Sequence, residues 1–291
     1  MRFFAAGIVC LVSSLYISSC NQIGESELMP ITTDSELALE YFQTGMIAFD
    51  RVKLVEAKYH FENAIREDPD FFMAYFWMYF ISSKSAKKIA VQALQSDASL
   101  SEGEKYIKTA FKYLMGGQNR KVVEYVEKAI DLYPKDPHVY KILYYIQLQI
   151  MWDVEGAIET LYQAIEASPD YAVPYNQLGY ALMETENFKK AEEAFDTYIK
   201  LAPDIANPYD SKGDFFMSTE QYEKAYESYM KAYEIDSSFT VSLKKAMKAK
   251  ELMERSLQRS SFSYSPLHQR YISCRPIVAV HYSQWQNHLC T

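Results

Sequence analysis

Histidine, cysteine and acidic side chains are the residues through which this chain of 291 residues could bind a metal or catalyse a reaction. The two histidines of the central region, His60 and His138, stand far apart, and neither lies at metal-ligand spacing from another ligand. No glycine-rich phosphate loop, GxSxG or HExxH motif occurs. The acids are plentiful, but they fall on solvated helix faces, and no carboxylate pair stands out. We therefore predict no catalytic site, cofactor or metal, and an enzyme with an unmarked site is kept as an alternative hypothesis.

Residues 255–291 differ from the rest of the chain because they contain no Lys, Asp or Glu. Histidines, cysteines and arginines collect there instead: His268, His281, His288, Cys274, Cys290, Arg255, Arg259, Arg270 and Arg275. The two cysteines could pair in an oxidising compartment, but their spacing fits no compact zinc motif. The segment could also fold back as a basic element on the acidic body. We favour a third interpretation, in which residues 259–291 are a disordered tail or the product of a shifted reading frame.

The charge of the remaining chain argues against one class of partner. All 38 acids lie between Glu25 and Glu254, and the formal net charge of the whole chain is −8. Nucleic acid needs a basic surface to neutralise its phosphates. The sequence therefore predicts no nucleic-acid binding.

The N-terminus has the pattern of an export signal. Arg2 precedes a short apolar run over residues 5–12, and this run is below the roughly 18 residues expected of a membrane-spanning helix. The segment Ile17-Ser18-Ser19-Cys20 resembles a bacterial lipobox, which implies lipidation of Cys20 and a signal peptide over residues 1–19. Two or three acyl chains would anchor the protein stably. Alternatives are an ordinary signal peptide cleaved near Ser19 and a retained single-pass anchor.

If the lipobox resemblance holds, residues 20–37 form a polar tether after the lipidated cysteine. The expected location is then the bacterial cell envelope, where the protein is lipid-anchored and either periplasmic or surface-exposed.

The elements that follow are predicted to be helices. Nine glycines and ten prolines are too few for an all-β chain, which must turn often. Four prolines, Pro69, Pro134, Pro169 and Pro203, each end a helical, acid-containing segment. The last two gaps between these prolines are almost equal, the first is nearly twice as long, and Ser237 stands one further gap beyond Pro203. The recurring distance of about 34 residues indicates a repeat architecture.

Small and aromatic residues recur at fixed distances before these marks. The aligned positions are an aromatic (Tyr41, Tyr106, Tyr175, Tyr209), a small residue (Gly45, Ala110, Gly179, Gly213), an alanine (Ala57, Ala157, Ala191, Ala225), a bulky residue (Phe61, Val126, Leu161, Phe195, Tyr229) and a second alanine (Ala64, Ala129, Ala164, Ala232). This pattern resembles the tetratricopeptide repeat over residues 38–239. The resemblance implies an all-α fold, an α-solenoid of tandem helix–turn–helix units in a right-handed superhelix. It also implies that the small residue meets the alanine of the second helix, so that the backbones approach closely.

The recognised copies cover approximately residues 38–71, 103–136, 138–171, 172–205 and 206–239. The 138–171 copy departs from the pattern, with Lys141 in the aromatic slot and Tyr145 in the small slot. Residues 72–100 form a degenerate pair that could pack as a sixth repeat or bulge out. A capping box, Ser101 to Glu104, opens the second copy. Residues 240–258 read as a polar helix that caps the array.

The resemblance also implies a binding surface, because first helices of this family line a concave groove. The offsets that face the groove are held by Phe42, Met46, Phe49, Ile107, Phe111, Ile142, Ile146, Asn176, Tyr180, Met183, Asp210, Asp214 and Met217. This groove would grade from apolar to acidic, and it lacks the basic set of a carboxylate clamp. We therefore predict a non-catalytic scaffold that binds a basic or apolar segment of a protein or peptide, for example within an envelope-assembly complex. The alternative is a surface lipoprotein receptor for a carbohydrate or another small nutrient.

Overall fold

The computed structural model describes residues 27–82, 85–96 and 99–263, and the regular elements in these ranges are all helices. The lipobox and residues 264–291 lie outside the described residues. In chain order the elements are α1 (Glu36–Asp50), α2 (Leu54–Glu67), α3 (Phe72–Ile81), α4 (Ala86–Gln95), α5 (Glu102–Met115), α6 (Asn119–Leu132), α7 (Pro137–Ile146), the π-helix η2 (Gln147–Met151), α8 (Val154–Ala167), α9 (Val173–Glu184), α10 (Phe188–Leu201), α11 (Ala206–Ser218), α12 (Tyr222–Ile235) and α13 (Thr240–Ser263).

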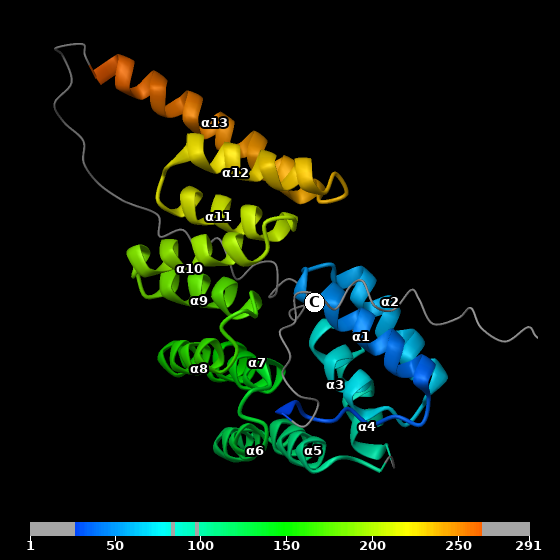
Figure 1. Cartoon of the computed structure of the whole chain (residues 1–291). Coiled ribbons are helices and arrows are strands. Elements are labelled where there is room, and N and C mark those ends of the chain that lie inside the picture. The colour runs from blue at the N-terminus through cyan, green and yellow to red at the C-terminus, as the bar shows by residue number, and fades with distance from the viewer. Residues whose placement is uncertain (1–26, 83–84, 97–98, 264–291) are drawn as a thin grey trace, which may run out of the picture.

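These helices stack as antiparallel pairs along a curved array (Figure 1). Each odd-numbered helix from α1 to α11 packs against the helix that follows it. The pair α3–α4 fills the place between the first and second recognised copies, so residues 72–100 pack as a further helix pair rather than bulge out. The last helix, α13, packs on α12 and covers the end of the array. The prediction of an all-α repeat superhelix is confirmed.

Local sequence explains where several helices begin. The Ser101 side chain accepts a hydrogen bond from the Glu104 backbone amide, and the Glu104 carboxylate accepts one from the Ser101 amide, which confirms the predicted capping box. Ser35 caps α1 and Asp153 caps α8 in a simpler way, each through one accepted hydrogen bond. Asp136 caps α7, where Pro137 occupies the first helical position.

In three of the repeats the small residue is a glycine that makes room for a ring of the second helix, and the expected contact with alanine stays a prediction. A Cβ built on Gly45 would lie 2.6 Å from the ring of Phe61, and one on Gly179 would lie 2.6 Å from that of Phe195. The same holds at Gly213, whose added Cβ would lie 2.5 Å from the Tyr229 ring. The glycine therefore lets the bulky residue of the second helix lie directly on the backbone of the first.

The turn within each recognised pair has one residue in the left-handed region. These residues are Val52, Gly117, Trp152, Glu186 and Glu220, with φ of 60°, 68°, 57°, 56° and 60°. Each stands at the same distance before its mark, which is one of the four prolines or Ser237. Only one of the five is glycine, the residue that adopts this conformation without steric cost. The backbone conformation of the turn is therefore the same in all five pairs, although the residue at this position differs.

The described part of the predicted polar tether is bound along the array. The Met29 amide donates to Asp136 at 3.0 Å, and the Thr32 amide and hydroxyl donate to Glu104 at 3.0 and 2.6 Å. The Met29 side chain is buried, and its sulfur would lie 2.6 Å from a Cβ built on Gly103. Residues 29–32 therefore form a strap that joins α5 and the turn before α7 to the start of α1.

Candidate interaction surfaces

None of the residues predicted to face a groove is exposed. Those that are buried are Phe42, Met46, Phe49, Ile107, Phe111, Ile142, Ile146, Asp210 and Asp214. Those that are half-buried are Asn176, Tyr180, Met183 and Met217. The structure places these side chains on the first helices of the pairs, as the repeat pattern implies, but packs them against neighbouring helices. Their role in binding a partner stays a prediction.

The apolar end of the predicted groove is filled by the chain's own rings. The Phe49 ring at the end of α1 lies 5.3 Å from that of Trp77 on α3 and 5.9 Å from that of Tyr145 on α7. Phe76 of α3 lies 5.4 Å from Phe111 of α5. These tilted and edge-to-face contacts are the favoured geometries of aromatic pairs. The first helix pair therefore packs its last aromatic ring against both α3 and α7.

The acidic end of the predicted groove already has a basic group from the same chain. Lys245 of α13 donates to Asp210 at 2.7 Å and to Asp214 at 2.8 Å. Tyr229 and Tyr180 donate to Asp214 at 2.6 and 2.9 Å. Burial raises the pKa of Asp210, whereas the pKa of Lys245 is raised because the two carboxylates outweigh its burial. The cluster thus fastens the capping helix to α11 and leaves its two acids with an internal partner.

Lys141 and Tyr145, the two residues of α7 that depart from the repeat pattern, both contact the end of α1. The Lys141 side chain is only 2% exposed and forms an ion pair with Asp50 at the end of α1. Its ammonium also donates to the Tyr171 hydroxyl at 2.8 Å, and that hydroxyl donates to Asp50 at 2.6 Å. Burial, followed by the Lys141 charge, lowers the pKa of His138 beside it. A lysine in an aromatic slot was the available sequence signal, but its partner in α1 lies too far away in the sequence to be recognised.

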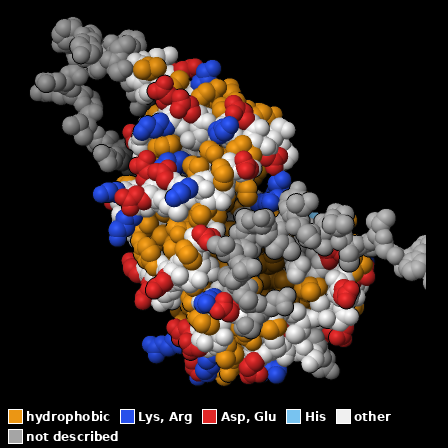
Figure 2. Space-filling model, in the orientation of Figure 1, with side chains coloured by type: hydrophobic (Ala, Val, Ile, Leu, Met, Phe, Trp, Pro, Cys, Tyr) orange, Lys and Arg blue, Asp and Glu red, His pale blue; other side chains and the backbone are white. Residues whose placement is uncertain are grey.

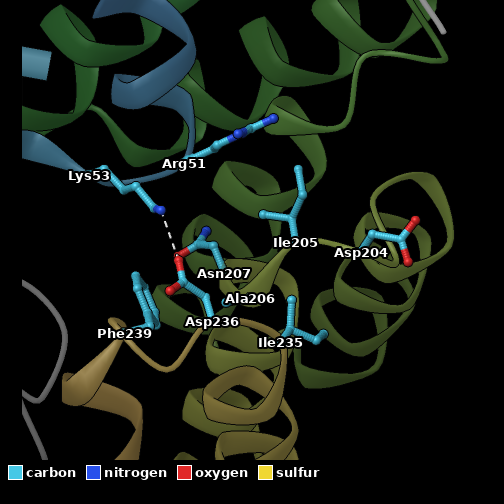
Figure 3. A pocket seen from close by; sticks show the side chains of 9 residues that line it. All are labelled: Arg51, Lys53, Asp204, Ile205, Ala206, Asn207, Ile235, Asp236 and Phe239. Carbon is cyan, nitrogen blue, oxygen red and sulfur yellow. Dashed lines mark ion pairs between the residues drawn. The ribbon is translucent and has the colours of Figure 1, made fainter. Parts of the chain in front are cut away.

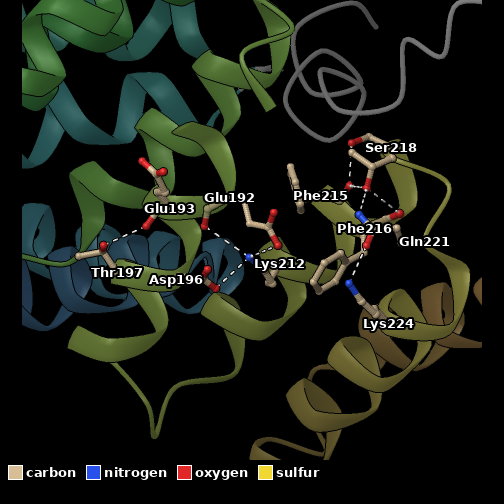
Figure 4. A network of polar contacts seen from close by, with 11 residues as sticks. Glu192, Glu193, Asp196, Thr197, Lys212, Phe215, Phe216, Ser218, Gln221 and Lys224 are labelled. Atoms are coloured by element: carbon tan, nitrogen blue, oxygen red, sulfur yellow. Dashed lines mark hydrogen bonds and ion pairs between the residues drawn. The ribbon is translucent and has the colours of Figure 1, made fainter. Parts of the chain in front are cut away.

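A second buried lysine joins neighbouring pairs (Figure 4). Lys212 of α11 donates to Glu192 at 3.3 Å and lies 2.8 Å from the Asp196 carboxylate, both on α10. Its ammonium lies 5.2 and 5.1 Å from the ring centroids of Phe215 and Phe216. Cation–π contact and two partly exposed carboxylates thus hold one buried cation. This network therefore holds α11 against α10, the last helix of the preceding repeat.

A small open cavity lies between the two ends of the array (Figure 3). Its volume is about 260 Å³. Its lining comes from the α1–α2 turn (Arg51, Lys53), the α10–α11 connection (Asp204, Ile205, Ala206, Asn207) and the end of α12 with the turn that follows it (Ile235, Asp236, Phe239). Within this lining, Lys53 forms an ion pair with Asp236 at 2.8 Å. Hydrogen bonds from Lys53 and Ser238 lower the pKa of Asp236 to about 2. The cavity marks a second place where the first pair meets distant repeats.

The outer face of α8 carries exposed aromatic and acidic side chains along one stripe. Trp152, 62% exposed, precedes the helix, and Tyr162 within it is 43% exposed. Glu155, Glu159 and Glu166 are also exposed, and with Tyr162 they follow a helical i, i+4, i+7, i+11 spacing. We call Trp152, Glu155, Glu159, Tyr162 and Glu166 the α8 stripe. Figure 2 shows hydrophobic and acidic side chains together over α8 and α9.

This stripe is distinct electrostatically because no Lys or Arg occurs between residues 142 and 188. The same stretch contains seven acids: Asp153, Glu155, Glu159, Glu166, Asp170, Glu184 and Glu186. Some surface acids of other helices have a basic partner on the same helix, as in the Lys121–Glu124–Lys128 triplet on α6. The three glutamates of the stripe form no ion pair with a described residue. Their negative charge therefore faces solvent uncompensated.

Among the described residues, no group of three or more His, Cys, Asp or Glu side chains is arranged to hold a metal ion. None of the described helices combines the length and the apolar character needed to cross a bilayer.

The fold and its surfaces define a class, an all-α helical repeat superhelix, and two sequence matches specify the repeat. Models of the tetratricopeptide repeat match residues 153–209 and residues 206–239. These ranges run from α8 to the turn before α13 and support a tetratricopeptide-repeat protein. Repeats of this kind generally bind protein partners. The search of curated proteins gave no match.

Several solved structures are similar to this chain at low identity. One is the APC/C hetero-tetramer Cut9–Hcn1, at 16% identity and a TM-score of 0.44, with 73% of this chain and 42% of that chain covered. Another is a thermophilic TPR protein of Thermus thermophilus, at 17% identity, a TM-score of 0.46 and coverages of 74% and 98%. The MamA protein matches at 19% identity and a TM-score of 0.38, with coverages of 69% and 93%. These values are too low to transfer a function.

Proposed function

We propose that this chain is a non-catalytic scaffold that binds a basic protein segment on the α8 stripe. The observation that carries this proposal is the exposed row of three glutamates and two aromatic rings in a stretch of sequence without Lys or Arg. A basic segment would supply the missing cations. Its arginine or lysine side chains would pair with the glutamates and lie over the Trp152 and Tyr162 rings, where cation–π contact adds to the attraction.

A crosslinking experiment tests the stripe directly. Tyr162 is replaced by the photo-crosslinking residue p-benzoylphenylalanine in the full chain, and Tyr59 serves as the matched control. Tyr59 is also an exposed tyrosine on a second helix, at 59%, but it lies on α2 beside the Lys58–Glu62 pair. We expect a crosslink from position 162, and not from position 59, to a peptide rich in Lys or Arg.

Charge reversal identifies the cause of that crosslink. The triple variant Glu155→Lys, Glu159→Lys, Glu166→Lys is expected to lose it, because the same surface then repels cations. The variant Glu193→Lys, a change at an exposed acid of α10, is expected to keep it. A crosslinked peptide without basic residues, or equal crosslinking from both tyrosine positions, would refute the α8 stripe as the binding surface.

We further propose that the protein is held at the bacterial cell envelope by lipid on Cys20. The support is the lipobox-like segment before this cysteine and the short apolar run that precedes it. Replacement Cys20→Ser is expected to abolish metabolic labelling with an alkyne fatty acid and to move the protein from the membrane to the soluble fraction. Labelling that survives this replacement would exclude the proposed anchor.

A further inference from the structure

Polar contacts join helices that do not neighbour each other in the stack. In an ordinary helical repeat array each repeat contacts only its neighbours. Here Asp50, at the end of α1, pairs with Lys141 of α7, and Lys53 of the next turn pairs with Asp236 after α12. The first helix pair therefore lies against the middle and the far end of the array as well as against α3.

The contact between α1 and α7 depends on the charges of Asp50 and Lys141. The Lys141 ammonium lies 5.9 Å from the Phe49 ring centroid, 5.8 Å from that of Trp77 and 5.4 Å from that of Tyr171. These rings remove water from the cation but carry no formal charge. Among the described residues, Asp50 is the only carboxylate in an ion pair with it. The closed form thus satisfies a buried cation with an anion that α1 alone supplies.

A closure of this kind can be reversible. The attraction of a buried ion pair is largely offset by the loss of hydration, so both ions recover much of their stabilisation in water when the pair separates. The stacking of neighbouring helices rests on apolar burial, whereas the contact between α1 and α7 combines the ion pair with the ring contact of Phe49 and Tyr145.

We propose that Asp50, Lys141 and Tyr171 form a clasp that holds the array closed on itself and whose release opens the gap between α1 and α7. Release uncovers the aromatic face formed by Phe49, Trp77 and Tyr145, which is buried in the closed form. The inference goes beyond the proposed function, since it involves neither the α8 stripe nor the lipid anchor.

Distance measurement between two spin labels tests the clasp. Labels are placed at Val55→Cys on α2, where the side chain is 87% exposed, and at Ser237→Cys in the exposed turn before α13. The full chain is used, with Cys10, Cys20, Cys274 and Cys290 replaced by serine. We expect one short, narrow distance distribution for the parent chain. With Asp50→Ala the distribution should shift to longer distances and broaden while helical circular dichroism is retained. The reason is that the Lys141 ammonium, without its carboxylate, is stabilised only when the contact opens and water hydrates it.

Matched variants make the outcome decisive. Asp50→Ala combined with Lys141→Met is expected to return the short distance, since no buried cation remains. Glu62→Ala, which removes an exposed ion-paired acid of α2, should leave the distance unchanged. The proposal is overturned if Asp50→Ala and Asp50→Asn both keep the parent distance. It is equally overturned if both lose helical signal, because the contact would then be a requirement for folding rather than for closure.

Discussion

At the residue scale, the left-handed turn position shows how the repeat imposes a backbone that its side chains do not favour. Residues other than glycine lose roughly 1–2 kcal/mol in this conformation. Glu220 adopts it with an exposed side chain, and Gly117 adopts it with nothing within 4 Å of an added Cβ. The two positions therefore isolate the backbone effect from packing.

We predict that Glu220→Gly raises the melting temperature, with a gain of about 1 kcal/mol, and that Gly117→Ala lowers it by a similar free energy. Thermal unfolding followed by circular dichroism measures both. A loss of stability in Glu220→Gly would show that its side chain contributes more than the turn strain costs.

The ring that rests on each glycine gives a second test at this scale. Gly179→Ala would place a methyl group within 2.6 Å of the Phe195 ring, and overpacking of this kind costs about 1–3 kcal/mol. The second copy contains alanine and valine at the same two positions, Ala110 and Val126, and packs both without exposure. We predict that adding Phe195→Val to Gly179→Ala costs less than the sum of the single variants in urea unfolding. Strict additivity would contradict the proposed contact.

At the element scale, α13 is fastened to the array by charge as well as by apolar packing. Lys245 faces two buried carboxylates, whereas Lys248 on the same helix pairs with exposed Glu251 at 2.9 Å. Removal of one partner from a buried ion cluster costs about 3–5 kcal/mol, while exposed pairs contribute about 0–1 kcal/mol. The difference predicts unequal effects of the same substitution at the two lysines.

We therefore expect Lys245→Met to release α13 and Lys248→Met to leave it bound. Hydrogen exchange measured by mass spectrometry should become fast across residues 240–258 in the first variant only. Equal protection of α13 in both variants would mean that the apolar contacts with α12 suffice.

The same scale shows how far sequence reasoning reaches. Helices, pairs and the capping helix followed from local signals: the small and aromatic residues at fixed offsets, the prolines, and the Ser101–Glu104 capping box. The sequence could not predict whether residues 72–100 pack as a helix pair within the array. That packing depends on contacts with α2 and α5 rather than on a motif. The contacts of Phe49 and Asp50 with α7 could not be predicted, since they join segments far apart in the sequence and depend on the accumulated curvature of the array.

At the scale of the whole molecule, buried and half-buried tyrosines make the array sensitive to high pH. Burial, the first cause at each site, raises the pKa of Tyr198 to about 12 and raises those of Tyr171 and Tyr180 well above their usual value. In the unfolded chain these hydroxyls ionise near pH 10. A folded pKa above the unfolded one gives stability that is complete below pH 10 and is lost as pH rises towards the folded value. Lys245, whose pKa is also raised, acts in the same direction because its ion pairs need the protonated form.

We predict that the free energy of unfolding falls between pH 10 and pH 12, by about 1.4 kcal/mol per pH unit for each such tyrosine. Urea unfolding at pH 8, 9, 10 and 11 measures the loss, with tyrosinate absorbance recorded in parallel. Tyr198→Phe should reduce the dependence on pH, because it removes one group that ionises only when the chain unfolds. Tyr162→Phe is the matched control, since Tyr162 is 43% exposed in the folded protein. Stability that stays constant from pH 8 to pH 11 would show that the buried hydroxyls ionise without unfolding, and that the array opens far enough to hydrate them.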